Sequence, residues 1–208
     1  MEAIYDRIEE QAKPYLDTRS NDIHVSVCYA MAQQLLSQYP EADPEVVLPA
    51  VLLHDVGWKM VPEEKQLGAF GPRAKDMETR RIHEIEGVEI ARRILVSLGY
   101  DRTKTEEILA IIEGHDSRDE ALSLNDAIVK DADRLWRFSQ VGMNTDFRRF
   151  KVDRTRYVIW LKKGVDGWLF TPAAKAIARQ GLADAGVPMA DGTDDEDISI
   201  DGLDEPSP

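Results

Sequence analysis

The sequence feature that most constrains this chain is a His-Asp pair at the end of an apolar run. Residues 46–53 are all apolar, and His54 and Asp55 follow directly. Such a run predicts a buried, central helix, with Gly57 as its C-terminal stop. Burying an imidazole beside a carboxylate is costly unless something compensates, and a metal ion is the natural compensation. The pair therefore predicts a metal site if further ligands exist.

The chain contains four histidines, and the other three each lie on the apolar face of a predicted amphipathic helix. These faces consist of His24, Cys28, Met31 and Leu35; of His83, Gly87, Ile90 and Ile94; and of Ile108, Ile111, Ile112 and His115. The helical spacing within each set directs all three rings toward the core. Asp131 and Asp133 lie about 200° apart around another predicted helix, so only one of them can be a ligand.

In chain order, His24, the His54-Asp55 pair and Asp133 resemble the signature of the HD superfamily of metal-dependent phosphohydrolases. The resemblance extends over about residues 20–140. It includes the sequence Ala-Asp-Arg-Leu at 132–135, by which Asp133 rather than Asp131 is the ligand. Asp131 is then expected either to orient a ligand or to lie at the surface. His83 and His115 resemble the two additional ligands of dinuclear members. The resemblance implies an all-α fold, an HD-domain helical bundle with a metal site in its core.

The implied activity is cleavage of a phosphate ester by a metal-activated water, on a nucleotide or another small phosphorylated metabolite. The implied metal ligands are His24, His54, Asp55, His83, His115 and Asp133. Nitrogen and carboxylate ligands suit Fe, Mn, Zn, Co or Ni, so the expected cofactors are two divalent transition metal ions bridged by Asp55. Two alternatives remain open. Some HD members with a similar ligand set oxidise a substrate with O2 at a diiron centre, and others bind nucleotides without catalysis.

Besides Asp55, three cations close to the ligands in sequence are candidate catalytic residues. Lys59 follows the His-Asp pair, although the family's signalling phosphodiesterases have His-Asp-x-Gly-Lys and Trp58 intervenes here. Arg134 and Arg137 lie within about one helical turn of Asp133 and are expected to bind phosphate.

The regions outside the motif carry less specific signals. Residues 58–79 contain several Pro and Gly residues and scattered charge, which predicts a long surface loop that closes over an anionic substrate. Residues 141–188 are basic and aromatic, which fits either the wall of a nucleotide pocket or a solvated face over an aromatic core. We expect one domain over residues 1–188 and an acidic, disordered tail over residues 189–208.

Composition narrows the protein class. The net charge of −13 disfavours nucleic acid and anionic membranes as partners, although nine acidic residues lie from Asp184 onward, where there is no Lys or Arg. No apolar stretch approaches the length of a membrane span and the N-terminus lacks a signal sequence, so we expect a cytoplasmic protein. The single cysteine, Cys28, cannot form a disulfide within the chain, which fits a reducing compartment. The oligomeric state stays open.

Overall fold

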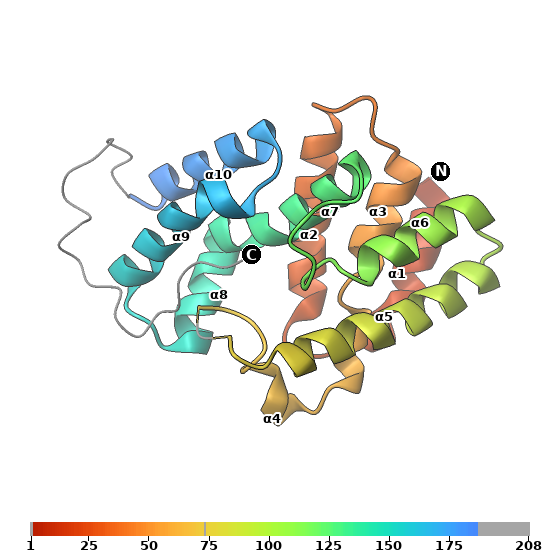
Figure 1. Ribbon diagram of the computed structural model, residues 1–208, viewed down its shortest axis with the longest axis horizontal. Helices are drawn as coiled ribbons and strands as arrows, with labels where there is room; N and C mark the ends of the chain where they lie inside the picture. The colour runs from red at the N-terminus through yellow and green to blue at the C-terminus, as the bar shows by residue number, and fades with distance from the viewer. Residues whose placement is uncertain (1, 73, 187–208) are drawn as a thin grey trace.

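The computed structural model describes residues 2–72 and 74–186, which form helices joined by turns and loops, with no strand in these ranges (Figure 1). The elements are α1 (Glu2–Leu16), α2 (Asn21–Leu36), α3 (Pro44–Leu53), η1 (Val56–Met60), α4 (Glu63–Gln66), α5 (Met77–Ser97), α6 (Arg102–Ile112), α7 (Leu124–Leu135), η2 (Trp136–Phe138), α8 (Gln140–Phe150), α9 (Arg154–Trp168) and α10 (Pro172–Asp184). The expected all-α class is confirmed. None of the described helices is both long and apolar enough to cross a bilayer.

Helix α3 lies at the centre of the bundle because its residues 46–53 are apolar on every side. Every residue from Val46 to Leu53 is buried, and α1, α2, α6 and α7 pack around them. Asp43 starts the helix by accepting the backbone N–H of Glu45 at 2.8 Å. The position of α3 brings its last residues, and the His-Asp pair after them, into the interior.

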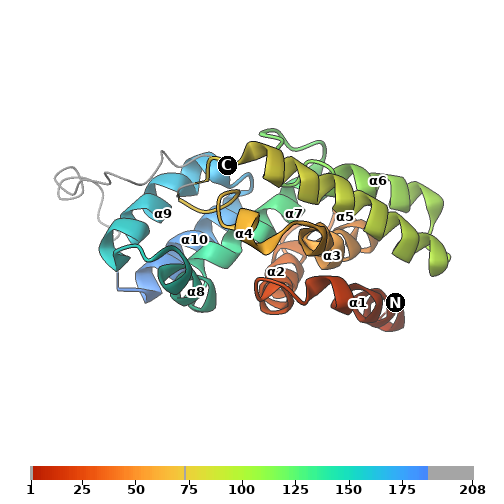
Figure 2. The same ribbon diagram turned by 90° about the horizontal axis from the view of Figure 1, so that it is seen from below.

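The helices form two groups connected through α7 and η2. Helices α1 to α3 and α5 to α7 form one group, and α8 to α10 form the other (Figure 2). One continuous apolar cluster, from Ile8 in α1 to Leu182 in α10, extends through both. Whether residues 1–188 are one domain, as expected, stays a prediction, and the predicted acidic tail lies outside the described residues.

The turn after α3 packs backbone against backbone on α5. A Cβ atom added at Gly57 would lie 1.9 Å from the carbonyl oxygen of His83 and 2.5 Å from the amide nitrogen of Gly87. The expectation that Gly57 ends the α3 helix is wrong, because α3 ends at Leu53 and Gly57 lies within η1. Glycine is needed at this position because two backbones approach too closely for any side chain.

The prediction of a long surface loop over residues 58–79 is wrong. The segment contains η1 and α4, and four of its side chains pack with Phe150 as a small buried cluster: Trp58, Val61, Ala69 and Phe70. The Gln66 side-chain amide donates to the carbonyl oxygens of Trp58 and Val61, at 3.2 and 2.9 Å, and ties the segment together. These apolar residues have no regular spacing, so periodicity does not reveal that they are buried.

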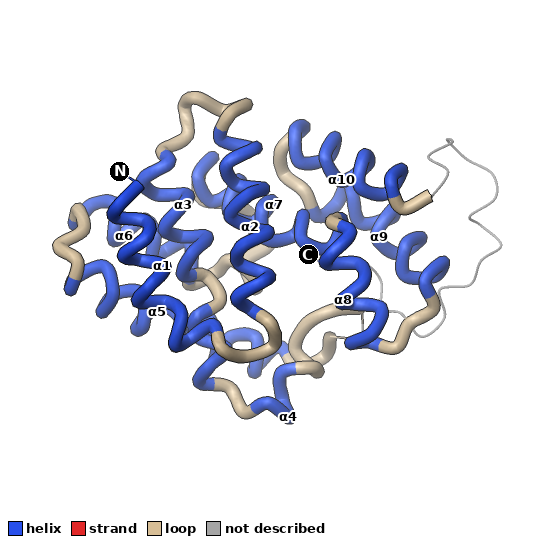
Figure 3. Tube along the Cα trace, turned by 180° about the vertical axis from the view of Figure 1, so that it is seen from behind, coloured by secondary structure: helices blue, strands red, loops and turns tan. Residues whose placement is uncertain are grey.

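The aromatic residues of the C-terminal helices mostly form core. Phe138, Tyr157, Trp160 and Trp168 are each at most 4% exposed, and the helices that carry them enclose one end of the molecule (Figure 3). These rings therefore form core, as one of the two alternatives expected, although Trp160 and Trp168 also border a cavity.

Asp131 is a buried structural residue, which corrects the expectation that it orients a ligand or lies at the surface. Its two carboxylate oxygens accept the backbone N–H groups of Phe170 and Thr171, at 2.8 and 2.9 Å. Asp131 thereby attaches the turn before α10 to α7.

We expect Asp131→Ala to destabilise the fold by about 2–4 kcal/mol, because it leaves two backbone N–H groups without their acceptor. Urea denaturation followed by circular dichroism measures the change. Asp153→Ala is the matched control, since Asp153 accepts the N–H of Arg156 at an exposed helix start and its loss should cost only about 1 kcal/mol. Equal effects of the two substitutions would contradict a special role for Asp131.

Candidate metal centre

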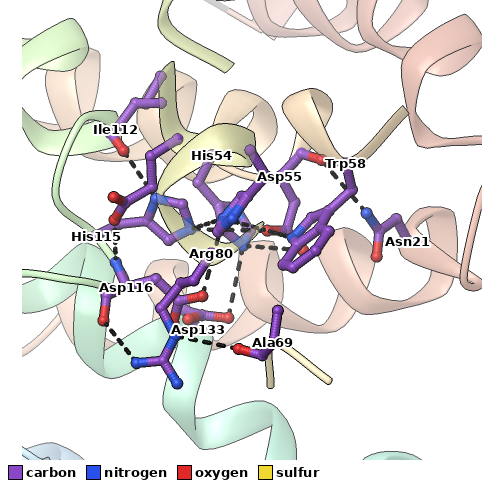
Figure 4. Close-up of polar contacts among 12 residues, drawn as sticks. Asn21, His54, Asp55, Trp58, Ala69, Arg80, Ile112, His115, Asp116 and Asp133 are labelled. Carbon is purple, nitrogen blue, oxygen red and sulfur yellow. Dashed lines mark hydrogen bonds and ion pairs between the residues drawn. The ribbon is translucent and has the colours of Figure 1, made fainter. Parts of the chain in front are cut away.

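All six predicted metal ligands meet in the interior of the helical bundle, and they come from five segments of the chain. Figure 4 shows four of them, His54, Asp55, His115 and Asp133, pointing toward one another. His24 lies in α2, His54 and Asp55 follow α3, His83 lies in α5, His115 follows α6, and Asp133 lies in α7. Three of the four imidazoles are at most 1% exposed. The structure therefore brings together residues that are up to 109 positions apart in the chain.

A first group of donors consists of His24, His54 and Asp133. The Nε2 atoms of His24 and His54 are 3.2 Å apart, and Asp133 Oδ1 lies 3.1 Å from the former and 3.5 Å from the latter. Donors bound to one transition metal at about 2.1 Å lie roughly 3.0–3.4 Å from each other. The spacing of this group fits one ion. The buried Cys28 Sγ is 3.6 Å from His24 Nε2 and belongs to the same cluster.

A second group consists of His83, His115 and Asp116. The Nε2 atoms of His83 and His115 are 3.3 Å apart, and Asp116 Oδ2 lies 3.8 Å from His83 Nε2. These donors also lie close enough together to hold an ion.

Asp55 lies between the two groups and presents one oxygen to each. Its Oδ2 is 3.4 Å from His24 Nε2 and 3.8 Å from His54 Nε2. Its Oδ1 is 3.9 Å from His83 Nε2 and 3.7 Å from His115 Nε2. This is the arrangement of a carboxylate that can bridge two ions.

Two of the histidine rings are oriented by the carbonyl oxygen three residues earlier. His54 Nδ1 is 2.8 Å from the oxygen of Val51, and His115 Nδ1 is 2.8 Å from that of Ile112. A proton on Nδ1 leaves the lone pair of Nε2 free, and each Nε2 points into the site. Neutral imidazoles of this tautomer are ready-made metal ligands, so the donor set fits a divalent transition metal.

Asp55 is held by two side chains that were not predicted from the sequence. The indole Nε1 of Trp58 donates to Asp55 Oδ1 at 2.9 Å, and the Asn21 amide donates to the Asp55 carbonyl oxygen at 3.4 Å. Asn21 is the first residue of α2 and is buried. Such contacts fix the direction of a ligand and tune its basicity.

The ionisation of Asp55 and His83 favours metal binding, whereas that of His115 opposes it. Burial opposes the charge of Asp55, but His54, His115 and His24 together hold the pKa of its carboxyl well below the usual range. Burial and the neighbouring His115 lower the pKa of His83 to about 4. Burial also disfavours the charged form of His115, yet Asp55 and nearby carboxylates raise its pKa to about 10. A metal ion would therefore compete with a proton for the Nε2 atom of this ring.

A cavity opens beside the metal ligands and is rich in arginine. His24, Asp55 and Asp133 line it, and so do five cations: Arg19, Arg80, Arg134, Arg137 and Arg149. Anions are attracted to such a concentration of positive charge next to a metal site.

The candidate catalytic cations differ in how they are placed. Arg134 donates through Nη1 to the carbonyl oxygen of Trp168, and its Nη2 is buried without a hydrogen-bond partner among the described residues. Arg137 forms an ion pair with Asp146 at 2.9 Å, so its charge is already compensated. Lys59 does not line the cavity, because its Nζ donates to the carbonyl oxygen of Asp17 at 3.1 Å. The geometry gives no support to a role for Lys59 at the site.

The segment after Lys59 contributes to the cavity in another way than expected. Phe70, Gly71, Pro72 and Ala74 line it, while the lysines of the segment do not. The segment lies against the cavity, but it contributes the Phe70 ring and the residues after it rather than lysine side chains. That it closes over an anionic substrate stays a prediction.

Glu84 is a further residue that the sequence reading missed. Its carboxylate is fully buried and accepts the backbone N–H groups of Asp116 and Ser117, at 3.0 and 2.9 Å, and the Ser117 hydroxyl at 2.6 Å. These bonds fix the turn that carries His115. Its position directly after His83 in the same helix could have indicated a supporting role at the site.

Comparison with known families agrees with this geometry, because the model of the HD domain matches residues 22–137, which include all six ligands. The chain belongs to the HD-domain family. A search among curated proteins found no match. Among solved structures, the HD-domain chain is similar to a predicted HD superfamily hydrolase from an uncultured Thermotogales bacterium, with a TM-score of 0.58 and 22% identity over 89% of this chain and 87% of that one. That likeness shows a shared fold.

Proposed function

We propose that this HD-domain protein is a cytoplasmic, metal-dependent phosphohydrolase with a dinuclear centre. The observation that carries the proposal is the position of Asp55, whose two oxygens face two separate pairs of histidines. His24, His54 and Asp133 would hold one ion, and His83 and His115 the other. When bound, two such ions supply an activated water and neutralise charge on a phosphoryl oxygen.

The residues around the centre favour an anionic substrate. Arg134 lines the cavity next to Asp133, and its Nη2 is buried without a hydrogen-bond partner among the described residues. A guanidinium suits the oxygens of a phosphate. Trp160 and Trp168 also line the cavity, and rings of this kind can pack against a nucleobase. The proposed substrate is therefore a nucleotide or another small phosphorylated metabolite.

The first experiment is to determine the metal content of protein purified without added metal and then to screen phosphate esters for release of inorganic phosphate. We expect about two ions per chain and phosphate release that a chelator abolishes. Consumption of O2 by an iron-loaded sample that releases no phosphate from any ester would replace this proposal with the oxygenase alternative.

The two-ion arrangement makes a specific prediction about stoichiometry. His83→Ala and His115→Ala should each lower the metal content from two ions toward one, because each removes a donor from the second group only. His24→Ala should also leave one ion, and the double substitution of His24 and His83 should leave none. Elemental analysis of the purified variants measures this. Two ions retained in His83→Ala would show that His83 does not hold the second ion.

A further inference from the structure

Arg19, in the turn between α1 and α2, carries hydrogen-bond donors that nothing in the described residues satisfies. Its Nε and Nη1 atoms are buried and have no partner. Leaving a buried donor unpaired costs about 1–3 kcal/mol, and more when the group is charged. Native proteins pair nearly all such groups, so an exception needs an explanation, and an absent ligand is one.

The Arg19 guanidinium is held next to the metal centre by two rings. Its Cζ lies 4.1 Å from the ring centroid of Trp58 and 3.8 Å from that of Phe70. His83 stacks on Trp58 at 4.0 Å with an interplanar angle of 12°. One face of the indole is therefore taken by His83, which leaves the other face for Arg19.

Trp58 connects this stack to the bridging carboxylate. Its Nε1 donates to Asp55 Oδ1 at 2.9 Å, and Arg19 and Asp55 both line the arginine-rich cavity. The positive charge of Arg19 is thus fixed on the opposite face of the Trp58 ring from His83, one of the residues that would hold a metal ion. Stacking leaves the edges of a guanidinium, where its N–H groups are, available to a ligand.

The backbone around Arg19 is strained as well. Arg19 has φ 53° and Ser20 has φ 60°, a left-handed conformation that costs a residue with a side chain roughly 1–2 kcal/mol. Arg149 stabilises it by donating from Nη2 to the Arg19 carbonyl oxygen at 2.6 Å. Strain of this kind gathers at ligand sites, where the surrounding structure maintains it.

We propose that Arg19 binds an anionic oxygen of the substrate's phosphate beside the metal centre. This inference rests on the proposed function and names one residue that recognises the reacting group. Arg134, whose Nη2 also lacks a partner in the same cavity, would donate to the same phosphate. Because Arg19 is already stacked and held in place, little conformational entropy is lost when the anion binds.

The test is calorimetric titration of the full-length, metal-loaded protein with inorganic phosphate. Arg19→Gln should weaken phosphate binding about 10- to 100-fold, as expected for loss of a charged hydrogen-bond donor. Arg19→Lys, which keeps the charge, should lie between Arg19→Gln and the wild type. Arg179→Gln is the matched control, since Arg179 in α10 forms an exposed ion pair with Asp166 in α9. This variant should bind phosphate as the wild type does.

Thermal denaturation of the same variants separates binding from a structural role. Because Arg19 carries unpaired donors, Arg19→Gln should keep its melting temperature within about 4 °C of the wild type, a change equivalent to roughly 1–2 kcal/mol or less. Unchanged phosphate affinity in Arg19→Gln would overturn the inference. So would a loss of affinity accompanied by a large fall in melting temperature and not eased in Arg19→Lys.

Failure of the proposed function would look different. If no phosphate ester is hydrolysed by the wild type but phosphate binding still depends on Arg19, the anion site stands and the reaction is wrong. If esters are hydrolysed and phosphate binding is indifferent to Arg19, the reaction stands and the role of Arg19 is wrong.

Discussion

Asp55→Asn is expected to remove both metal ions and to reduce phosphate-ester hydrolysis at least about 1,000-fold, since metal activation supplies several kcal/mol of transition-state stabilisation. The substitution keeps the shape of the side chain but deletes the negative charge that faces four imidazoles. It also places an amide NH2 group where one of the two groups of donors needs an oxygen. Elemental analysis and the phosphate-release assay measure both effects.

The matched control for this substitution is Asp131→Asn. Asp131 is an equally buried aspartate in the helix that carries Asp133, but its oxygens face the backbone of Phe170 and Thr171. We expect Asp131→Asn to keep both ions and most of the activity, even where its stability falls. Retention of two ions and full activity in Asp55→Asn would show that the carboxylate does not bridge the centre.

The metal ligands could be predicted from the sequence because each stands where a polar group is out of place. His24, His83 and His115 share helical faces with aliphatic residues, and His54 directly follows the apolar run of residues 46–53. Inward-pointing polar groups have to meet partners, and four of them in one small core have to meet each other. The choice of Asp133 over Asp131 came from the family motif, and the structure places only Asp133 among the histidines.

The residues that surround the ligands could not be predicted in this way. Arg19 and Trp58 act through ring contacts with segments far away in the chain, and nothing in their local spacing indicates those contacts. Glu84 follows His83 directly, but its partners Asp116 and Ser117 lie more than 30 residues away. The charge of Lys59 suggested a phosphate ligand, but in the structure its Nζ donates to the carbonyl oxygen of Asp17. Short-range patterns report which face of a helix is buried, whereas pairings between elements depend on the packed fold.

The second large effect is expected for Gly57→Ala, which should destabilise the protein by about 3 kcal/mol or more through overpacking. The added methyl group would overlap the carbonyl oxygen of His83 and the backbone of Gly87. Neither is a flexible side-chain end that can move aside. Relief requires η1 and α5 to separate, and chemical denaturation measures the cost.

Gly167→Ala provides the control, because a Cβ at Gly167 meets nothing within 4 Å. This glycine lies in α9, where alanine should stabilise the helix by about 0.5–1 kcal/mol. Separation of η1 from α5 also moves His83 away from Asp55. The folded fraction of Gly57→Ala should therefore bind the second ion more weakly than the wild type does. Wild-type stability with normal metal content in Gly57→Ala would mean that the two backbones are not in contact and that the second group of ligands is not assembled by this approach.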